Sequence, residues 1–190
     1  MASAASSIPA FESLASAVRG PVIRPGDCTY DEARSVFNGM IDRKPAVIVR
    51  CTGVADVTHC VRFAHESGIH VSVRGGGHSV VGHAVCNGGL MIDLSLMRSV
   101  HVNPVRRTGR AEGGATWGDF DHETHAFSLA TTGGVVRSTG LAGLTLAGGH
   151  GLLMRKYGLA CDNLLGAEIV TADGHLLRAS DGENDDLFWA

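Results

Sequence analysis

The stretch VSVRGGGHSVVGHAV, residues 71–85, holds the residue types best suited to chemistry. Three consecutive glycines lie between Arg74 and His78, directly after an alternating segment of strand type. A glycine run at the end of a strand allows backbone N–H groups to converge on an anion, because no Cβ keeps the ligand away. Arg74 adds a positive charge and a forked donor. The stretch therefore predicts a pyrophosphate cradle, although loop flexibility alone would also explain its glycines.

These glycines differ from the dinucleotide fingerprint of doubly wound folds. That fingerprint spaces its glycines as GxGxxG, opens a helix and is followed by an acidic residue about 20 positions later. Here the glycines are contiguous, and the VVGHAV that follows them does not predict a helix. A GGG tripeptide alone is a weak signal, so its interpretation depends on its neighbours.

His78 is the second candidate for chemistry, because an imidazole can act as a nucleophile, a base or a metal ligand. A polar loop histidine is the simpler interpretation. Metal binding is not favoured by the other histidines. His59 and His65 would lie on different faces of a helix, whereas His122 and His125 share a face but lack the HExxH pattern.

The segments before this loop predict the elements that hold it. A β-branched run at residues 46–50 predicts a strand, residues 56–68 predict a helix that ends at Gly68, and residues 69–73 predict a second strand. Strand, helix and strand in this order are typical of a parallel βαβ unit.

The segments after the loop favour short elements. Thr116 is a candidate N-cap for a following helix. Two apolar runs around Asp173 and Gly174 predict a hairpin with a type I′ turn. The other expected elements are a helix from Thr29 or Asp31 to about Gly39, with Ala33, Val36 and Phe37 on one side, strands at residues 90–97 and around Val100 and Val102, a short helix within residues 148–158 and a helix that begins within residues 183–190.

The composition of the chain excludes several classes of function. The 190 residues carry a formal charge of −3, and no block of lysine or arginine supports a role on nucleic acid or on a membrane surface. The N-terminus has no signal-peptide pattern, which predicts a cytoplasmic protein whose first ten residues are loose. The five scattered cysteines predict small buried residues in a reducing compartment. The 26 glycines are clustered, which indicates backbone brought close to another group.

Several segments together resemble a known family. VSVRGGGHSVVGHAVCNGGLMIDLSLM is similar to the flavin-attachment segment of FAD-linked oxidases of the berberine bridge enzyme type, within the p-cresol methylhydroxylase and vanillyl-alcohol oxidase superfamily. The similarity continues in order through EGGATWGDFDHET, TTGGVVRSTGLAGLTLAGGHG and AEIVTADGHLLRAS to ENDDLFWA. It covers nearly the whole chain from about residue 28, which makes it more specific than any single glycine motif.

The resemblance implies where FAD would bind. One set of residues would surround the pyrophosphate and the flavin edge, a second would form a backbone wall along the cofactor, and one would meet the adenine. These sets are Arg74, Gly75, Gly76, Gly77, His78, Ser79, Gly82 and His83, then Thr139, Gly140, Gly143 and Gly149, and finally Val170.

The resemblance also implies a covalent link from His78 to the 8α carbon of the flavin. Some members of the family form a second link through a cysteine, but Val136 stands at that position here, so a single histidyl link is expected. Cys161 comes too late in the sequence for that role and is expected to be a small buried residue.

The fold implied is α+β, a two-subdomain FAD-binding domain of the p-cresol methylhydroxylase type. We expect an N-terminal extension at residues 1–27, a small subdomain with a βαβ unit at residues 28–100, and a larger subdomain with a mixed or antiparallel sheet at residues 101–190. Relatives continue into a substrate domain, so we expect a fragment or a shortened homologue that is inactive alone.

The function implied is that of the FAD-binding part of an oxidase. Such an enzyme takes a hydride from a carbon that bears OH or N and passes electrons to O2, with a small-molecule substrate bound by the further domain. The alternative is a non-catalytic module that binds a nucleotide or anion with the same fold. No nucleic-acid or membrane partner is expected, whereas self-association through exposed apolar surface around the LFWA segment is possible.

Overall fold

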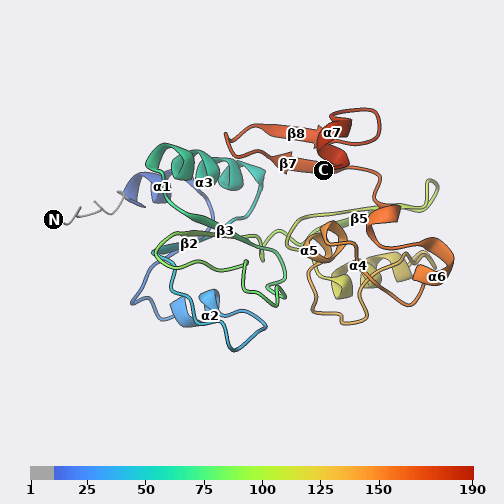
Figure 1. Ribbon diagram of the computed structural model, residues 1–190, viewed down its shortest axis with the longest axis horizontal. Helices are drawn as coiled ribbons and strands as arrows, with labels where there is room; N and C mark the ends of the chain where they lie inside the picture. Colours follow the sequence, from blue (N-terminus) through green and yellow to red (C-terminus); the bar gives the residue numbers. More distant parts are fainter. Residues whose placement is uncertain (1–10) are drawn as a thin grey trace.

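The computed structural model describes residues 11–190 and has an α+β architecture with three small sheets (Figure 1). The expected looseness of the first ten residues falls outside this range. The elements are α1 Phe11–Ala17, β1 Val22–Ile23, α2 Tyr30–Arg34, β2 Val47–Arg50, α3 Val54–Ser67, β3 Val71–Arg74, β4 Leu90–Asp93, β5 Val100–Asn103, β6 Thr108–Ala111, α4 Trp117–His125, α5 Leu141–Leu146, α6 Met154–Tyr157, a 3-10 turn at Cys161–Asn163, β7 Ala167–Val170, β8 Leu176–Ala179 and α7 Asp185–Phe188.

The first sheet has the strand order β1-β2-β4-β3, in which β4 is parallel to both β2 and β3. The predicted βαβ unit is therefore present and parallel, but its two strands are not neighbours, because β4 lies between them. The register aligns Arg74, at the end of β3, with Asp93 at the end of β4. The glycine loop thus leaves the sheet at the carboxyl edge of its parallel strands.

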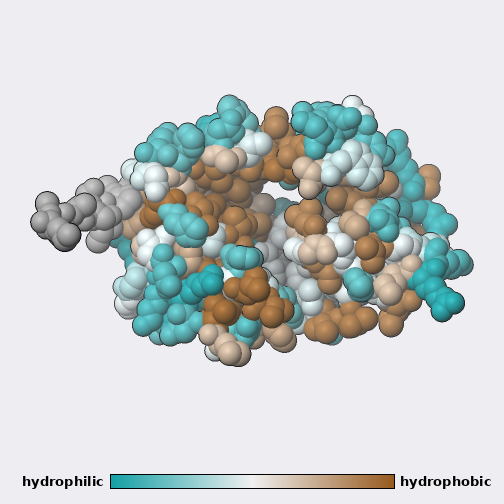
Figure 2. All heavy atoms as spheres, in the orientation of Figure 1, coloured by the Kyte–Doolittle hydropathy of each residue, from teal (hydrophilic) through white to brown (hydrophobic). Residues whose placement is uncertain are grey.

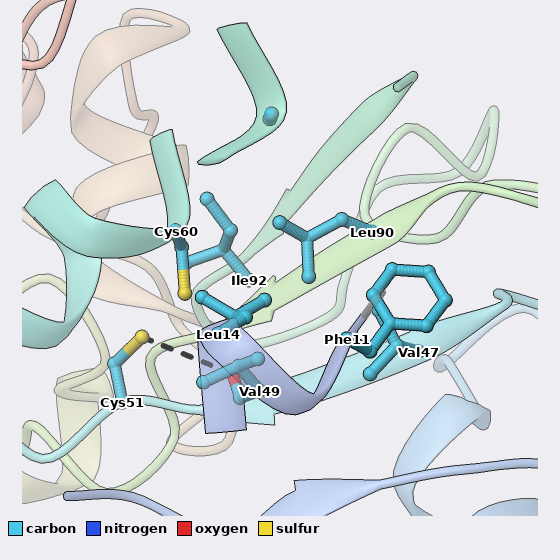
Figure 3. Packing of buried hydrophobic residues seen from close by; sticks show 9 residues of the cluster. Phe11, Leu14, Val47, Val49, Cys51, Cys60, Leu90 and Ile92 are labelled. Carbon is cyan, nitrogen blue, oxygen red and sulfur yellow. Dashed lines mark hydrogen bonds between the residues drawn. The ribbon is translucent and has the colours of Figure 1, made fainter. Parts of the chain in front are cut away.

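Both faces of the two central strands are buried. Val47, Val49, Leu90 and Ile92 pack on one face with Phe11 and Leu14 of α1, Cys60 of α3, and Cys51 directly after β2 (Figure 3). Ile48 and Met91 pack with Tyr30 of α2 and Val85 on the other face. Since the strands that precede the loop are covered on both sides, they are a rigid base for it.

Helix α3 ends as the sequence predicts, whereas α2 does not. Gly68 is the C-cap of α3 and adopts a left-handed φ of 62°. The predicted helix to Gly39 is wrong, because α2 ends at Arg34 and Ser35 continues in extended backbone. Residues 35–43 instead run alongside the glycine loop, where the amide N–H of Phe37 donates to the carbonyl of Gly77.

The chain after residue 100 forms two separate antiparallel hairpins, β5–β6 and β7–β8, together with α4 to α7. The β7–β8 hairpin is confirmed, but the type I′ turn is wrong. Only Gly174 of its turn has a positive φ, 79°, and the N–H of Gly174 donates to the carbonyl of Thr171. The turn is therefore a three-residue loop that places Gly174 at its left-handed position. The division of the chain near residue 100 stays a prediction.

Helix α4 begins with the capping interaction that Thr116 predicts. The Thr116 hydroxyl accepts from the N–H of Asp119, and the Asp119 carboxylate accepts from the N–H of Thr116. Arg98 binds the same carboxylate through two nitrogens, at 2.9 and 2.5 Å. This charge-assisted bond is the main cause that lowers the pKa of Asp119 to about 2.

The lowered pKa predicts that this cap supports the fold only while Asp119 is ionised. Its contribution is full above about pH 4, where the unfolded carboxyl is also ionised, and is lost as the pH falls toward the folded pKa of about 2. Asp119→Asn is expected to lower the free energy of unfolding by about 1 kcal/mol at pH 7 and by less at pH 3. Urea unfolding at both pH values measures this, and an unchanged midpoint at pH 7 would contradict it.

Candidate functional site

The candidate site begins where β3 ends, in the loop of residues 74–83. Gly77 and Gly82 adopt left-handed φ values of 71° and 76°, which a side chain would disfavour. Both glycines are buried, whereas His83 at the end of the loop is exposed. The hydroxyl of Ser79 accepts from the N–H of His83 at 3.2 Å, so the loop also holds its own curvature.

The glycine run has a different immediate role from the one that the sequence suggests. A Cβ on Gly75 would lie 2.9 Å from the carbonyl of Gly113, and a Cβ on Gly76 would overlap the backbone of Gly140. The missing side chains are therefore required by protein packing, and not only by access for a ligand. They bring residues 75–76 into backbone contact with two segments that are distant in the sequence.

The amide groups of the same loop are left free. Within residues 11–190, no acceptor bonds the N–H of any residue from 75 to 81. Consecutive free amides in a loop with left-handed residues are the type of donor set that binds phosphate groups in other proteins. The loop therefore fits the pyrophosphate of a dinucleotide.

The guanidinium of Arg74 was expected to donate to the pyrophosphate, but part of it is bound by the protein itself. Its Nη1 donates to the carbonyl of Ala33 at 2.6 Å, which ties the end of β3 to α2. Its buried Nε has no partner among the described residues and lies 3.2 Å from where a Cβ of Gly77 would be. Arg74 thus supports the loop from beside it, and one N–H remains for an anion.

His78 lies between two residues that sequence reasoning did not single out as site residues. Its ring stacks on Phe37, with centroids 4.3 Å apart and planes 13° from parallel. Its Nε2 lies 3.2 Å from the hydroxyl of Ser138. Ser138 is next to Thr139 in the second predicted segment, but Phe37 was expected on a helix face. The half-buried imidazole therefore has a fixed orientation.

The second segment meets the first at two predicted residues, Thr139 and Gly140. Gly140 forms an isolated antiparallel bridge with Thr116, and the carbonyl of Thr139 accepts from the N–H of Trp117 at 3.0 Å. The capped N-terminus of α4 thereby fixes Gly140 against Gly76. The structure thus brings Thr139 and Gly140 to the loop, and their place along the cofactor stays a prediction.

The other predicted contacts are more distant in the fold. Gly143 is exposed in α5, where a Cβ would meet nothing within 4 Å. Gly149 has a φ of 81° and is packed against Leu144 and Ala160, so packing explains it. Val170 is half-buried at the end of β7, in a hairpin that contacts α3. Roles for these three residues toward a cofactor stay predictions.

A hollow separates the two halves of the molecule. Figure 2 shows it below the β7–β8 hairpin, between the half with α3 and β3 and the half with α4 and α5. The hairpin crosses above it and joins the two halves.

The cysteines are only partly as expected. Cys51, Cys60 and Cys86 are buried, but Cys28 is exposed and Cys161 is half-buried, so the expectation of buried residues is wrong for these two. The neighbouring Cys60 thiol and burial raise the pKa of Cys51, which keeps it protonated.

Within residues 11–190, no group of His, Cys, Asp and Glu is suited to a metal, and no helix is long and apolar enough to cross a membrane.

Comparisons with known proteins place the chain among flavoproteins. The family described as FAD binding domain matches residues 45–180. (R)-6-hydroxynicotine oxidase of Paenarthrobacter nicotinovorans is 42% identical over 173 residues, which are 91% of this chain and 38% of that protein. The structure of BBE-like 1 from Physcomitrella patens gives a TM-score of 0.89 at 30% identity, over 94% of this chain and 39% of that one. A chitooligosaccharide oxidase gives 0.87 at 32%, over 94% and 38%. The chain thus spans less than two fifths of these relatives.

Proposed function

The chain belongs to the FAD binding domain family, and we propose that it holds FAD covalently through His78 as part of an oxidase. The observation that carries this proposal is the neighbourhood of His78. Seven consecutive residues with free amides include His78 itself, and its ring is fixed between Phe37 and Ser138. A loop that only bound an anion would have no need of an oriented nucleophile.

The residues have distinct tasks toward the cofactor. The amides of residues 75–81 would bind the pyrophosphate, with the Nε of Arg74 beside them. Gly140 and Thr139 would form the opposite wall, and the β7–β8 hairpin with Val170 would meet the adenine. His78, in its neutral form, would offer a ring nitrogen to the 8α carbon, and the single histidyl link follows because Val136 stands where a cysteine would be needed.

FAD, when bound, supplies two-electron chemistry, and the chain supplies its binding and orientation. We propose a substrate with a hydride on a carbon that bears OH or N, because one relative is an oxidase of 6-hydroxynicotine and another of a chitooligosaccharide. The substrate would be held by a region outside these 190 residues. Oxygen consumption by the purified chain with a sugar or an amine would contradict that division of roles.

Ser138 is expected to govern how fast the flavin becomes attached. Ser138→Ala removes the hydroxyl that bonds the Nε2 of His78, so the ring can rotate on Phe37. We expect attachment to slow by about fivefold, since one hydrogen bond of about 1 kcal/mol orients the ring. The measurement is the rate at which acid-stable flavin accumulates on the protein after FAD is added.

The matched control is Ser180→Ala, a half-buried serine in the β8 region. It is expected to attach flavin at the parent rate. Equal rates for Ser138→Ala and the parent protein would show that Ser138 has no part in positioning the imidazole.

A further inference from the structure

Residues 37–43, between α2 and β2, bind the glycine loop through its carbonyl groups. The N–H of Phe37 donates to the carbonyl of Gly77 at 3.0 Å, and the amide side chain of Asn38 donates to the carbonyl of Val80 at 2.7 Å. Arg43 makes the largest contribution. Its Nη1 donates to the carbonyls of Gly82 at 2.6 Å and Val85 at 3.0 Å, and its Nη2 to that of Val81 at 3.4 Å.

These bonds determine where the loop amides point. A trans peptide unit holds its C=O and N–H groups in one plane and in opposite directions. When the carbonyls of Gly77, Val80 and Val81 are bound by residues 37–43, the N–H groups of the following residues must face the other way. Those are His78, Val81 and Gly82. The amides of His78 and Val81 are among the free donors described above.

Arg43 also places a positive charge behind the loop. No carboxylate within residues 11–190 forms an ion pair with it, because neighbouring Asp42 is bound to Arg34 instead. Arg34 also donates to the carbonyl of Arg43 at 3.2 Å, which anchors this part of the chain to α2. A half-buried guanidinium bound only by carbonyls adds a fixed positive charge beside the loop, which favours an anion there.

We propose that Arg43 is a positioning residue that preorganises the loop of residues 77–85 for a diphosphate. Its guanidinium binds the carbonyls of Val81, Gly82 and Val85, which holds the C-terminal side of the loop in place, while Phe37 and Asn38 orient the free amides of His78 and Val81. No carboxylate among the described residues neutralises the charge of Arg43. The identification of this diphosphate as FAD rests on the proposed function, because FAD is the diphosphate that the family implies. The effect of Arg43 on the loop is independent of the proposed function, because its hydrogen bonds to the loop form in the chain without any ligand.

The test compares Arg43→Met with Lys44→Met. Lys44 is adjacent, exposed and equally charged, and no bond of its side chain reaches the loop. Both variants are made in the His78→Ala background, so that FAD remains exchangeable. Hydrogen exchange is measured without FAD, at single-residue resolution, for the bonded loop amides of Gly82, His83 and Val85. FAD affinity is measured by fluorescence titration.

Arg43→Met is expected to accelerate exchange in the loop at least tenfold, to leave the exchange of β2 and β4 unchanged, and to weaken FAD binding by at least tenfold. Lys44→Met should match the parent on all three measurements. Loop exchange at the parent rate in Arg43→Met overturns the proposal, as does faster exchange with unchanged FAD affinity.

Two further outcomes are also decisive. If neither the parent nor the variants bind FAD, the proposed function fails, and the exchange rates still decide whether Arg43 orders the loop. Should Arg43→Met not fold, Arg43→Lys replaces it, because a lysine keeps the charge but cannot span three carbonyls. In that case the proposal predicts faster hydrogen exchange of the loop amides in Arg43→Lys. Exchange at the parent rate in this variant would overturn the proposal.

Discussion

Replacing His78 with alanine is expected to abolish covalent attachment of flavin to the chain. In the proposed link a ring nitrogen of His78 is the nucleophile, and neighbouring Ser79 has a hydroxyl that is already bound to the N–H of His83. The loop amides and Arg74 are unaffected, so FAD should still bind reversibly. Flavin fluorescence that migrates with the denatured polypeptide measures the link, and it should fall from near one per chain to background.

The control for this prediction is Cys161→Ala. Cys161 is half-buried in the 3-10 turn, and its thiol bonds the carboxylate of neighbouring Asp162 at 3.7 Å. This variant should retain its flavin through denaturation. If His78→Ala keeps covalent flavin, or if Cys161→Ala loses it, the attachment residue has been assigned wrongly.

Gly76→Ala is expected to be the most disruptive small substitution at the site. Its new Cβ would overlap the backbone N and Cα of Gly140, where no flexible side chain can move aside. The two segments must then separate, which should lower the free energy of unfolding by about 2–4 kcal/mol. It should also abolish FAD binding, because the loop and the opposite wall lose their contact.

Gly143→Ala is the matched control for the unfolding measurement. Gly143 lies in α5, and a Cβ there would meet nothing within 4 Å. Helix propensity alone predicts a gain of about 0.5–1 kcal/mol. Denaturant unfolding of both variants decides the matter, and a Gly76→Ala protein as stable as its parent would show that the two segments do not touch.

Local signals in the sequence were sufficient for much of the fold. Gly68 predicts the end of α3 because a left-handed C-cap is a property of one residue, and Thr116 predicts a cap for the same reason. The sequence did not predict Phe11–Ala17 or Val22–Ile23, because a helix of about two turns and a two-residue strand leave little periodicity. The insertion of β4 between β2 and β3 depends on long-range pairing, which no local pattern reveals.

The sequence predicts part of the candidate site from local signals and misses the part that depends on long-range packing. RGGGHS identifies the loop, and the resemblance adds Thr139 and Gly140, which the structure brings to it. Phe37, Asn38 and Arg43 could not be predicted, since their roles require residues 35–43 to run beside a loop about 40 positions later. The orientation of Arg74 toward Ala33 depends on the same packing.

The most direct test of the central claim is the intact mass of the purified protein under denaturing conditions. A covalent link through His78 predicts the mass of the 190-residue chain plus that of one FAD. A yellow protein whose denatured chain has only its sequence mass would contradict the link while leaving reversible FAD binding in place. A colourless protein at the sequence mass that takes up no added FAD would contradict the account as a whole.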